Sequence, residues 1–221
     1  MKPAFVFCLA LFFWLKTAAQ DSLSSTASII KWTPLKAVGV VNPSIELSFE
    51  QFTGRRWSTS LTGAWMLPGS IPDIGSPVHP DASGYMAGLE QRYYFVRSNW
   101  FSQVYSGLQL QYRERYFTSL WEFGSRSVLD TGLLYEDTFR VSRRHYTINA
   151  VLGTQFVWKR FVLDIYGGLG LRHRAVTHSD RRLPGDVMAH PRHPGFVFPA
   201  NKEGSYWTVS VPLNIRIGWQ L

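Results

Sequence analysis

Eight charged side chains lie on the polar sides of segments in which apolar and polar residues alternate. They are four acids and four arginines: Glu46, Glu50, Glu90, Asp164, Arg92, Arg113, Arg172 and Arg216. Charges that face one another in a water-poor space pair, because an unpaired charge there is costly. Two functions fit this set: a gated path for protons or ions, or a salt-bridge network that fills the interior and fixes strand register. We favour the network, because an open path would leave these charges unpaired, and unpaired charges inside a membrane protein are costly.

Histidines form a second group of candidate residues, late in the chain: His173, His178, His190 and His193. Their spacing is not that of a zinc finger, no cysteine accompanies them, and the neighbouring prolines favour an extended stretch. This pattern predicts a solvated loop that responds to pH. We therefore predict no metal site and no cofactor.

A lipid-modifying enzyme would need a serine, a histidine and an acid close together near the outer rim of a membrane barrel. His145 and His173 fall at about that height, with Ser142 and Ser179 near them in the sequence. A triad is defined by geometry, so this closeness in sequence is not evidence of one. We predict no catalytic residues, and keep an outer-membrane lipid A deacylase-like enzyme as an alternative.

Strands must position these side chains, because no long window shows helical periodicity and a period of two recurs. In residues 207–219 every odd position is apolar, with Trp207 and Trp219 at the ends, as is typical of a strand that crosses a bilayer. Six earlier segments alternate in the same way: 45–50, 57–65, 85–95, 100–113, 146–158 and 161–172. We predict an eighth strand over residues 29–38, where Pro34 indicates an edge-like position.

The connections predict how these strands are arranged. Residues 53–56, 97–99 and 159–160 are short connections, whereas 67–83, 114–143 and 174–205 are long. This asymmetry is typical of outer-membrane barrels, whose periplasmic turns are tight and whose outer loops are extended. Lipid offers no hydrogen-bond partners to the unpaired N–H and C=O groups of an open sheet edge, so the sheet must close into a barrel. The predicted fold is all-β, an eight-stranded antiparallel up-and-down transmembrane β-barrel with both termini on the periplasmic side.

The first 19 residues have the features of a cleaved signal peptide. Lys2 precedes an apolar run from Ala4 to Leu15, and Ala19 ends the segment. The run is shorter than the roughly 20 residues of a transmembrane helix. Residues 20–221 then form the barrel without cysteine, since Cys8 is the only one in the chain. A mean hydropathy of −0.09 excludes a bundle of membrane-spanning helices.

Three motifs resemble an uncharacterised family of small Bacteroidetes-type outer-membrane β-barrels. They are Ile30-Lys31-Trp32-Thr33-Pro34-Leu35, Gly54-Arg55-Arg56-Trp57-Ser58 and Glu90-Gln91-Arg92-Tyr93-Tyr94-Phe95. The resemblance implies an eight-stranded barrel of OmpA-like or OmpX-like architecture, located in the outer membrane. It implies no catalytic residues.

The partners expected from the sequence are outer-membrane lipid and lipopolysaccharide, whose phosphates would meet Arg181, Arg182 and Arg192. The net charge of +8 attracts anions, but because the chain is expected to be exported we predict no nucleic-acid partner. The apolar residues within 114–143 predict a hairpin extending the flanking strands, a loop folded over the barrel mouth, or a contact surface for an extracellular partner.

These patterns predict a non-enzymatic integral outer-membrane barrel with a polar, plugged lumen and long extracellular loops. Its role would be structural or surface interaction. A soluble lipocalin-like periplasmic binder is a further alternative, because apolar alternation also suits a soluble barrel. That alternative requires a hydrophobic lumen, and therefore the opposite orientation of the two faces.

Overall fold

The computed structural model describes residues 28–37, 43–68, 81–97, 102–124, 135–183, 186–188 and 202–221. The predicted signal peptide lies outside these ranges, as do His190, Arg192 and His193. Within the described ranges, no helix is both long enough and apolar enough to cross a membrane.

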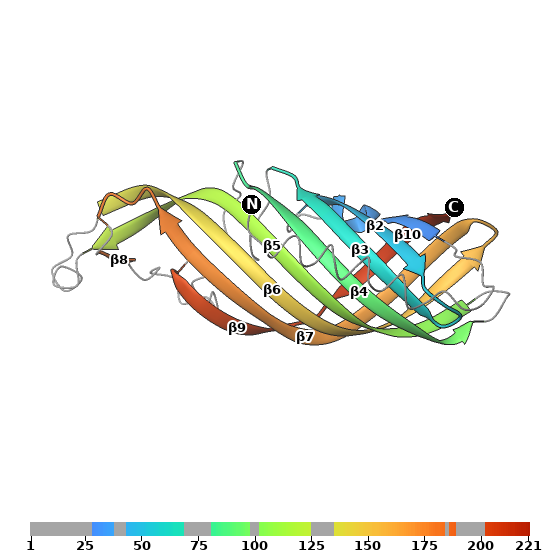
Figure 1. Cartoon of the computed structure of the whole chain (residues 1–221). Helices are drawn as coiled ribbons and strands as arrows, with labels where there is room; N and C mark the ends of the chain where they lie inside the picture. Colours follow the sequence, from blue (N-terminus) through green and yellow to red (C-terminus); the bar gives the residue numbers. More distant parts are fainter. Residues whose placement is uncertain are drawn as a thin grey trace.

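The chain folds into a closed, eight-stranded antiparallel β-barrel (Figure 1). Its strands are β1 Ser28–Trp32, β2 Ser44–Phe52, β3 Trp57–Met66, β4 Ser83–Arg97, β5 Ser102–Gly124, β6 Tyr135–Trp158, β7 Phe161–Ser179, and a last strand made of β9 Gly204–Ser210 and β10 Leu213–Gln220. Sequence neighbours pair, and β10 also pairs with β1, where Gln220 lies opposite Ile29. This pairing closes the sheet and confirms the predicted all-β, eight-stranded antiparallel barrel.

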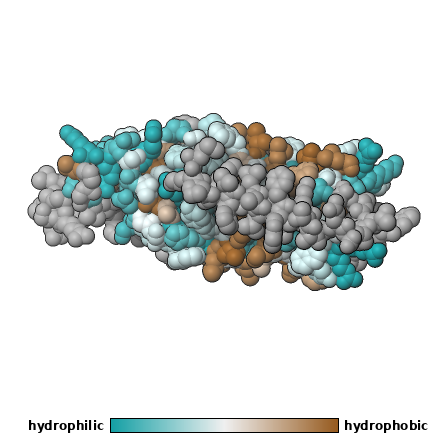
Figure 2. All heavy atoms as spheres, viewed as in Figure 1, coloured by the Kyte–Doolittle hydropathy of each residue, from teal (hydrophilic) through white to brown (hydrophobic). Residues whose placement is uncertain are grey.

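The two faces of the barrel have opposite chemistry. Apolar side chains point outward, with Leu213 79% exposed, whereas Arg216 on the same strand is fully buried inside. Figure 2 shows hydrophobic residues gathered over the barrel between two more hydrophilic ends. A polar residue on the outer face, Gln91, accepts a hydrogen bond from the Thr59 hydroxyl of the neighbouring strand, at 2.8 Å. The alternation in the sequence therefore marks inside and outside correctly.

The first strand is shorter than predicted. It ends at Trp32, and residues Pro34–Ala37 form the short helix α2, so the prediction of a strand over residues 29–38 is wrong at Pro34–Ala37, and Val38 lies outside the described residues. Proline has no N–H for a sheet ladder, but its fixed φ suits the first turn of a helix. Thr33 makes the final ladder bond, in which its N–H donates to the Glu46 carbonyl at 3.1 Å.

Of the three alternatives for residues 114–143, the described part of the segment shows the first, a hairpin that extends the flanking strands. Strands β5 and β6 stay paired from the barrel out to Phe123 opposite Tyr135, at the end of the molecule away from the short turns (Figure 1). The predicted loop over 174–205 is likewise shorter, because β7 continues to Ser179 and β9 begins at Gly204. The two-residue strand β8, Val187–Met188, pairs with the tip of β5.

This hairpin has a small core of its own on its inner face. The core consists of Ala82, Phe117, Phe123, Phe139, Val141 and Val176, all of them buried. On the outer face of the same strands lie exposed polar side chains such as Thr118, Glu122 and Arg140. Apart from the outward Leu120, the extension thus packs its large apolar residues inward, opposite to the barrel below it.

Two adjacent glycines of β7 provide a matched test of strand packing. A Cβ on the inward Gly168 would lie 2.2 Å from the Ala150 carbonyl oxygen, whereas one on the outward Gly167 would have nothing closer than 3.7 Å. We expect Gly168→Ala to destabilise the barrel by about 1–3 kcal/mol, the usual range for overpacking. Gly167→Ala should be neutral or stabilising by about 0.5 kcal/mol. Urea unfolding in detergent measures both, and equal midpoints for the two variants would contradict this packing.

Candidate functional site: an ion-pair network inside the barrel

The centre of the barrel is filled by charged side chains from opposite walls. Lys31 of β1 lies with its Nζ 2.5 Å from Glu50 Oε2 and 2.7 Å from Asp164 Oδ2. Arg92 of β4 contacts the same two acids, with Nη1 2.8 Å from Asp164 Oδ2 and 3.4 Å from Glu50 Oε2. Its Nε also pairs with Glu90 Oε1 at 2.6 Å. All five side chains are buried, so β1, β2, β4 and β7 are joined across the interior.

A second set of contacts continues the network towards β10. Arg216 Nη1 lies 3.3 Å from Glu90 Oε2, and Arg216 Nε lies 3.8 Å from Glu46 Oε1. Lys36 of helix α2 pairs with Glu46 Oε2 at 3.0 Å. The helix that replaced the predicted strand therefore supplies a cation to the network.

Tyrosines and amides bind the remaining carboxylate oxygens. The Tyr94 hydroxyl donates to Glu50 Oε1 at 2.6 Å, and the Tyr105 hydroxyl donates to Asp164 Oδ1 at 2.7 Å. Gln109 Nε2 donates to Glu90 Oε2 at 3.0 Å. Buried carboxylates are tolerated only when they are both paired and hydrogen-bonded, and these acids meet both conditions.

The network is electrically balanced. Four cations, Lys31, Lys36, Arg92 and Arg216, face four anions, Glu46, Glu50, Glu90 and Asp164. An eight-stranded barrel has an interior just wide enough for side chains to fill. Chemically, this arrangement holds the strands in register and fills the passage with fixed, mutually neutralised charges.

Six of the eight predicted residues meet in this network, and two do not. Arg113 and Arg172 also face inward, but they lie nearer the hairpin end, where Arg113 Nη2 contacts the Met86 sulfur at 3.6 Å and Arg172 Nη2 donates to the Ser210 hydroxyl at 3.4 Å. The sequence analysis missed the two lysines of the network, Lys31 and Lys36. The signal for Lys31 was present, because Lys31 lies between the exposed Ile30 and Trp32 and therefore alternates inward.

The histidines and serines proposed for an enzyme do not come together. His145 faces the interior, opposite Arg113 on one side and Arg174 on the other, whereas Ser142 of the same strand points to the opposite face. His173 faces outward, with its ring 4.9 Å from that of Trp207. Ser179 is six residues farther along β7, about 20 Å away at the rise of a strand. The described part of the chain therefore forms no serine–histidine–acid cluster around either histidine.

The surroundings of His145 are strongly positive. Burial lowers the pKa of this imidazole, and the nearby Arg113, Arg172, Arg143 and Arg174 lower it further, to about 3. Its ordinary pKa is 6.5, so the folded protein keeps the ring neutral where an unfolded chain would bind a proton. This contribution disfavours the folded state as the pH falls from 6.5 towards 3.

A carboxylate on the outer face, Glu114, is enclosed by its neighbours. Arg144 Nε, the Tyr85 hydroxyl and the Tyr112 hydroxyl each lie 2.7 Å from one of its oxygens. Burial alone would raise the pKa of Glu114, but hydrogen bonds from Arg144 and from the tyrosines, including Tyr116, lower it to about 2. The cluster ties β4, β5 and β6 together where the barrel continues into the hairpin.

The Glu114 cluster predicts a specific pH dependence. Because the folded pKa lies below the ordinary 4.5, its stabilisation is complete above about pH 4.5 and is lost as the pH falls towards 2. We expect Glu114→Gln to lower the unfolding free energy at pH 7 by about 1–3 kcal/mol, the range for charged hydrogen bonds. That difference from the wild type should shrink between pH 5 and pH 2. Glu122→Gln, exposed on the same strand, is the control, and a pH-independent difference for Glu114→Gln would contradict the prediction.

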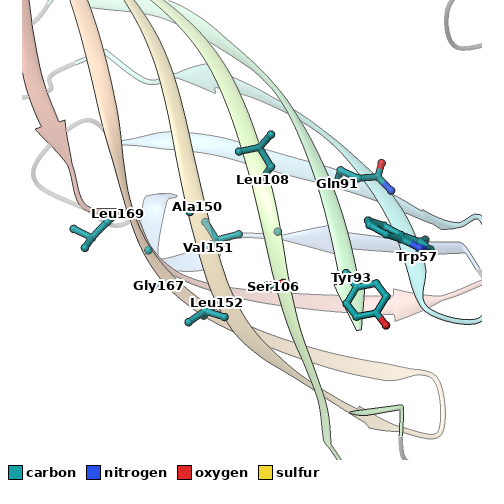
Figure 3. A pocket seen from close by; sticks show the side chains of 12 residues that line it. Trp57, Gln91, Tyr93, Ser106, Leu108, Ala150, Val151, Leu152, Gly167 and Leu169 are labelled. Carbon is teal, nitrogen blue, oxygen red and sulfur yellow. The ribbon is translucent and has the colours of Figure 1, made fainter. Parts of the chain in front are cut away.

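A shallow groove lies on the outside of the barrel across β3 to β7 (Figure 3). Its lining is formed by Trp57, Gln91, Tyr93, Ser106, Gly107, Leu108, Ala150, Val151, Leu152, Gly167, Gly168 and Leu169. None of these residues is an acid, a histidine or a basic residue. The groove therefore offers apolar contact rather than acid–base chemistry.

The arginines expected to meet phosphates on the outside differ in placement. Arg181 stacks over the Phe123 ring, 4.4 Å from its centroid, and donates to the backbone carbonyl of Leu183. Arg182 is exposed, and its backbone N–H donates to Asp137. Only Arg182 of this pair is thus presented to solvent.

The three motifs behind the family resemblance fall at separate places on the barrel: across β1 and α2, at the β2–β3 turn, and along β4. Among the described residues, no cluster of histidines, cysteines and acids is arranged to hold a metal ion. No protein-family description matches the chain, and no curated protein is significantly similar to it.

Proposed function

We propose that the protein is a non-enzymatic integral outer-membrane β-barrel, closed by the ion-pair network, whose hairpin end serves surface interaction. The observation that carries this proposal is the orientation of the faces. Leu108, Leu152 and Leu213 are exposed, whereas Glu50, Arg92 and their partners are buried. A soluble binder of the lipocalin type requires the reverse arrangement, with an apolar lumen and a polar exterior.

Aromatic side chains on the outer face support the position of the bilayer. A row of rings crosses four neighbouring strands near the hairpin end: Tyr112, Tyr146, His173 and Trp207 lie in register, with centroid separations of 5.1, 6.3 and 4.9 Å. Near the short turns, Trp57, Phe95, Trp158 and Trp219 are exposed on the same face. Two such girdles are typical of the interfaces of a transmembrane barrel.

The outer face changes character beyond the ring row. On β6, the outward residues Ile148 and Leu152 are followed, past Tyr146, by Arg144, Arg140 and Glu136. On β5, the apolar outward stretch runs from Val104 to Tyr112, and a membrane-crossing strand needs about 9–11 residues. The hairpin then extends beyond the membrane with a polar exterior, available for contact with other surface molecules.

Membrane fractionation combined with gel mobility before and after boiling tests the proposal. We expect the mature protein in the outer-membrane fraction, with a folded band that shifts on boiling, because closed barrels resist unfolding by detergent. Recovery in the soluble fraction with no heat-dependent shift would overturn the proposal.

The network further predicts that the purified barrel does not conduct ions in a planar bilayer.

A further inference from the structure

The groove on the outside of the barrel runs obliquely between the two aromatic girdles. Trp57 and Tyr93 form its end at β3 and β4, and Trp57 directly follows the short turn between β2 and β3 (Figure 3). Towards the other end, Leu152 of β6 lies six residues from Tyr146 and six from Trp158, the girdle residues of that strand. The groove therefore leads from the short-turn girdle to the level midway between the girdles.

The dimensions of the groove suit one hydrocarbon chain of a lipid. Neighbouring strands lie about 4.8 Å apart, so the four spacings from β3 to β7 give a length of about 19 Å. One leaflet of the hydrocarbon core is about 15 Å thick, and a chain that crosses it obliquely follows a slightly longer path. Small outward residues, Ser106, Ala150 and Gly167, occupy diagonal positions on three neighbouring strands and leave the surface hollow there.

A cation lies beside the short-turn end of the groove. Arg56 Nη1 donates to the Tyr93 hydroxyl at 3.0 Å, and the rings of Tyr93 and Trp57 pack edge to face with centroids 5.0 Å apart. The phenol is neutral, so this contact holds the guanidinium next to the groove without neutralising its charge. Arg56 is exposed, and a guanidinium binds phosphate oxygens in a bidentate manner.

An amide lies one cross-strand row farther along the barrel wall. Gln91 Oε1 accepts the hydrogen bond from Thr59, and the Gln91 side chain is exposed on the outer face, where it lines the groove. Lipid hydrocarbon offers no partner to the Nε2 group of such an amide. In a glycerophospholipid, ester carbonyls lie between the phosphate and the hydrocarbon chains. Arg56, Gln91 and the hollow surface follow one another in that same order.

We propose that the groove binds one anionic phospholipid from the leaflet on the short-turn side. Its phosphate lies on Arg56, an ester carbonyl accepts from Gln91, and one hydrocarbon chain lies along Ala150 and Gly167. A phosphate without an ammonium group beside it leaves its charge to Arg56, so an anionic headgroup fits better than a zwitterionic one. This inference rests on the proposed membrane location.

Native mass spectrometry of the folded mature protein in dodecyl maltoside, with added phosphatidylglycerol or phosphatidylcholine, tests the inference. We expect one phosphatidylglycerol retained per chain, in preference to phosphatidylcholine. Arg56→Gln should weaken phosphatidylglycerol binding about tenfold, as for the loss of a charged hydrogen bond, and should remove the preference. Arg160→Gln, which removes an exposed arginine from the turn between β6 and β7, is the matched control and should stay within about twofold of the wild type.

A second pair of variants tests the hydrocarbon part of the site. Ala150→Phe fills the hollow and should weaken binding of both lipids. Ala87→Phe adds the same ring to an exposed outward position of β4 that does not line the groove, and should bind as the wild type does. The unboiled gel band of every variant shows separately whether the barrel has folded.

Three results would each overturn the inference. They are equal retention of the two lipids by the wild type, an equal loss in Arg160→Gln and Arg56→Gln, and a lipid-free dimer that Ala150→Phe dissociates, which would assign the groove to a second copy of the chain. A folded barrel that retains no lipid would refute this inference alone. A protein that stays soluble and monomeric without detergent would instead refute the proposed function.

Discussion

Replacing Arg92 with methionine is expected to destabilise the folded barrel by about 3–5 kcal/mol. Arg92 is fully buried and contacts Glu50, Glu90 and Asp164, so its removal leaves three buried carboxylates with an excess of negative charge. Methionine has a similar reach and no charge, so the loss reports the missing ion pairs rather than a large cavity. Urea unfolding in detergent, followed by tryptophan fluorescence, measures the difference.

Arg160→Met is the control for this experiment. Arg160 is exposed in the turn between β6 and β7, and its change should stay within about 0.5 kcal/mol of the wild type. If Arg92→Met also fell within 1 kcal/mol of the wild type, the side chains inside the barrel would be solvated and the network would not support the fold.

Placing arginine at Leu108 is expected to lower the stability of the lipid-embedded barrel by about 2–4 kcal/mol, the range for a basic residue at the bilayer midplane. Leu108 is half-exposed on the outer face of β5, between the aromatic girdles. Folding into phospholipid vesicles at a series of guanidinium concentrations measures the effect.

Leu120 provides the matched control on the same strand. It is as exposed as Leu108 and also faces outward, but it lies on the hairpin, beyond the row of rings. Leu120→Arg should leave the folding free energy within about 0.5 kcal/mol of the wild type. Equal effects of the two substitutions would place both leucines in the same medium and contradict a membrane boundary near Tyr112.

The strand alternation was enough to predict the barrel but not the length of its strands. Below Tyr112 the apolar side chains of β5 point outward, whereas above it Phe117 and Phe123 point inward. Apolar residues still recur at every second position, but they change from the outward to the inward positions of the strand. A sequence window that includes both parts therefore shows apolar residues on both faces. Such a window does not distinguish a hairpin that extends the strands from an apolar loop, so the sequence analysis leaves both alternatives open for residues 114–143.

Alternation also predicts on which face a charge lies but not its height along the barrel. Arg113 and Arg172 were correctly expected inside, yet they lie in rows above Gln109 and Asn149 rather than among the ion pairs. Height depends on the stagger between strands, which is fixed by many weak pairings at once. The face of Lys31 was harder to predict for a different reason, because only the five residues Ser28–Trp32 alternate before Pro34, too short a pattern to define a strand from the sequence alone.

The central claim is that hydrocarbon surrounds the apolar exterior of a barrel whose interior is ionic. The collision rates of oxygen and of a water-soluble nickel chelate with nitroxide labels test it in reconstituted vesicles. The chain from residue 20 onward has no cysteine, so Leu108→Cys and Leu120→Cys each give a single labelling site. We predict that the label at position 108 collides mainly with oxygen and that the label at position 120 collides mainly with the nickel chelate. Dominance of the nickel chelate at both positions would contradict the account.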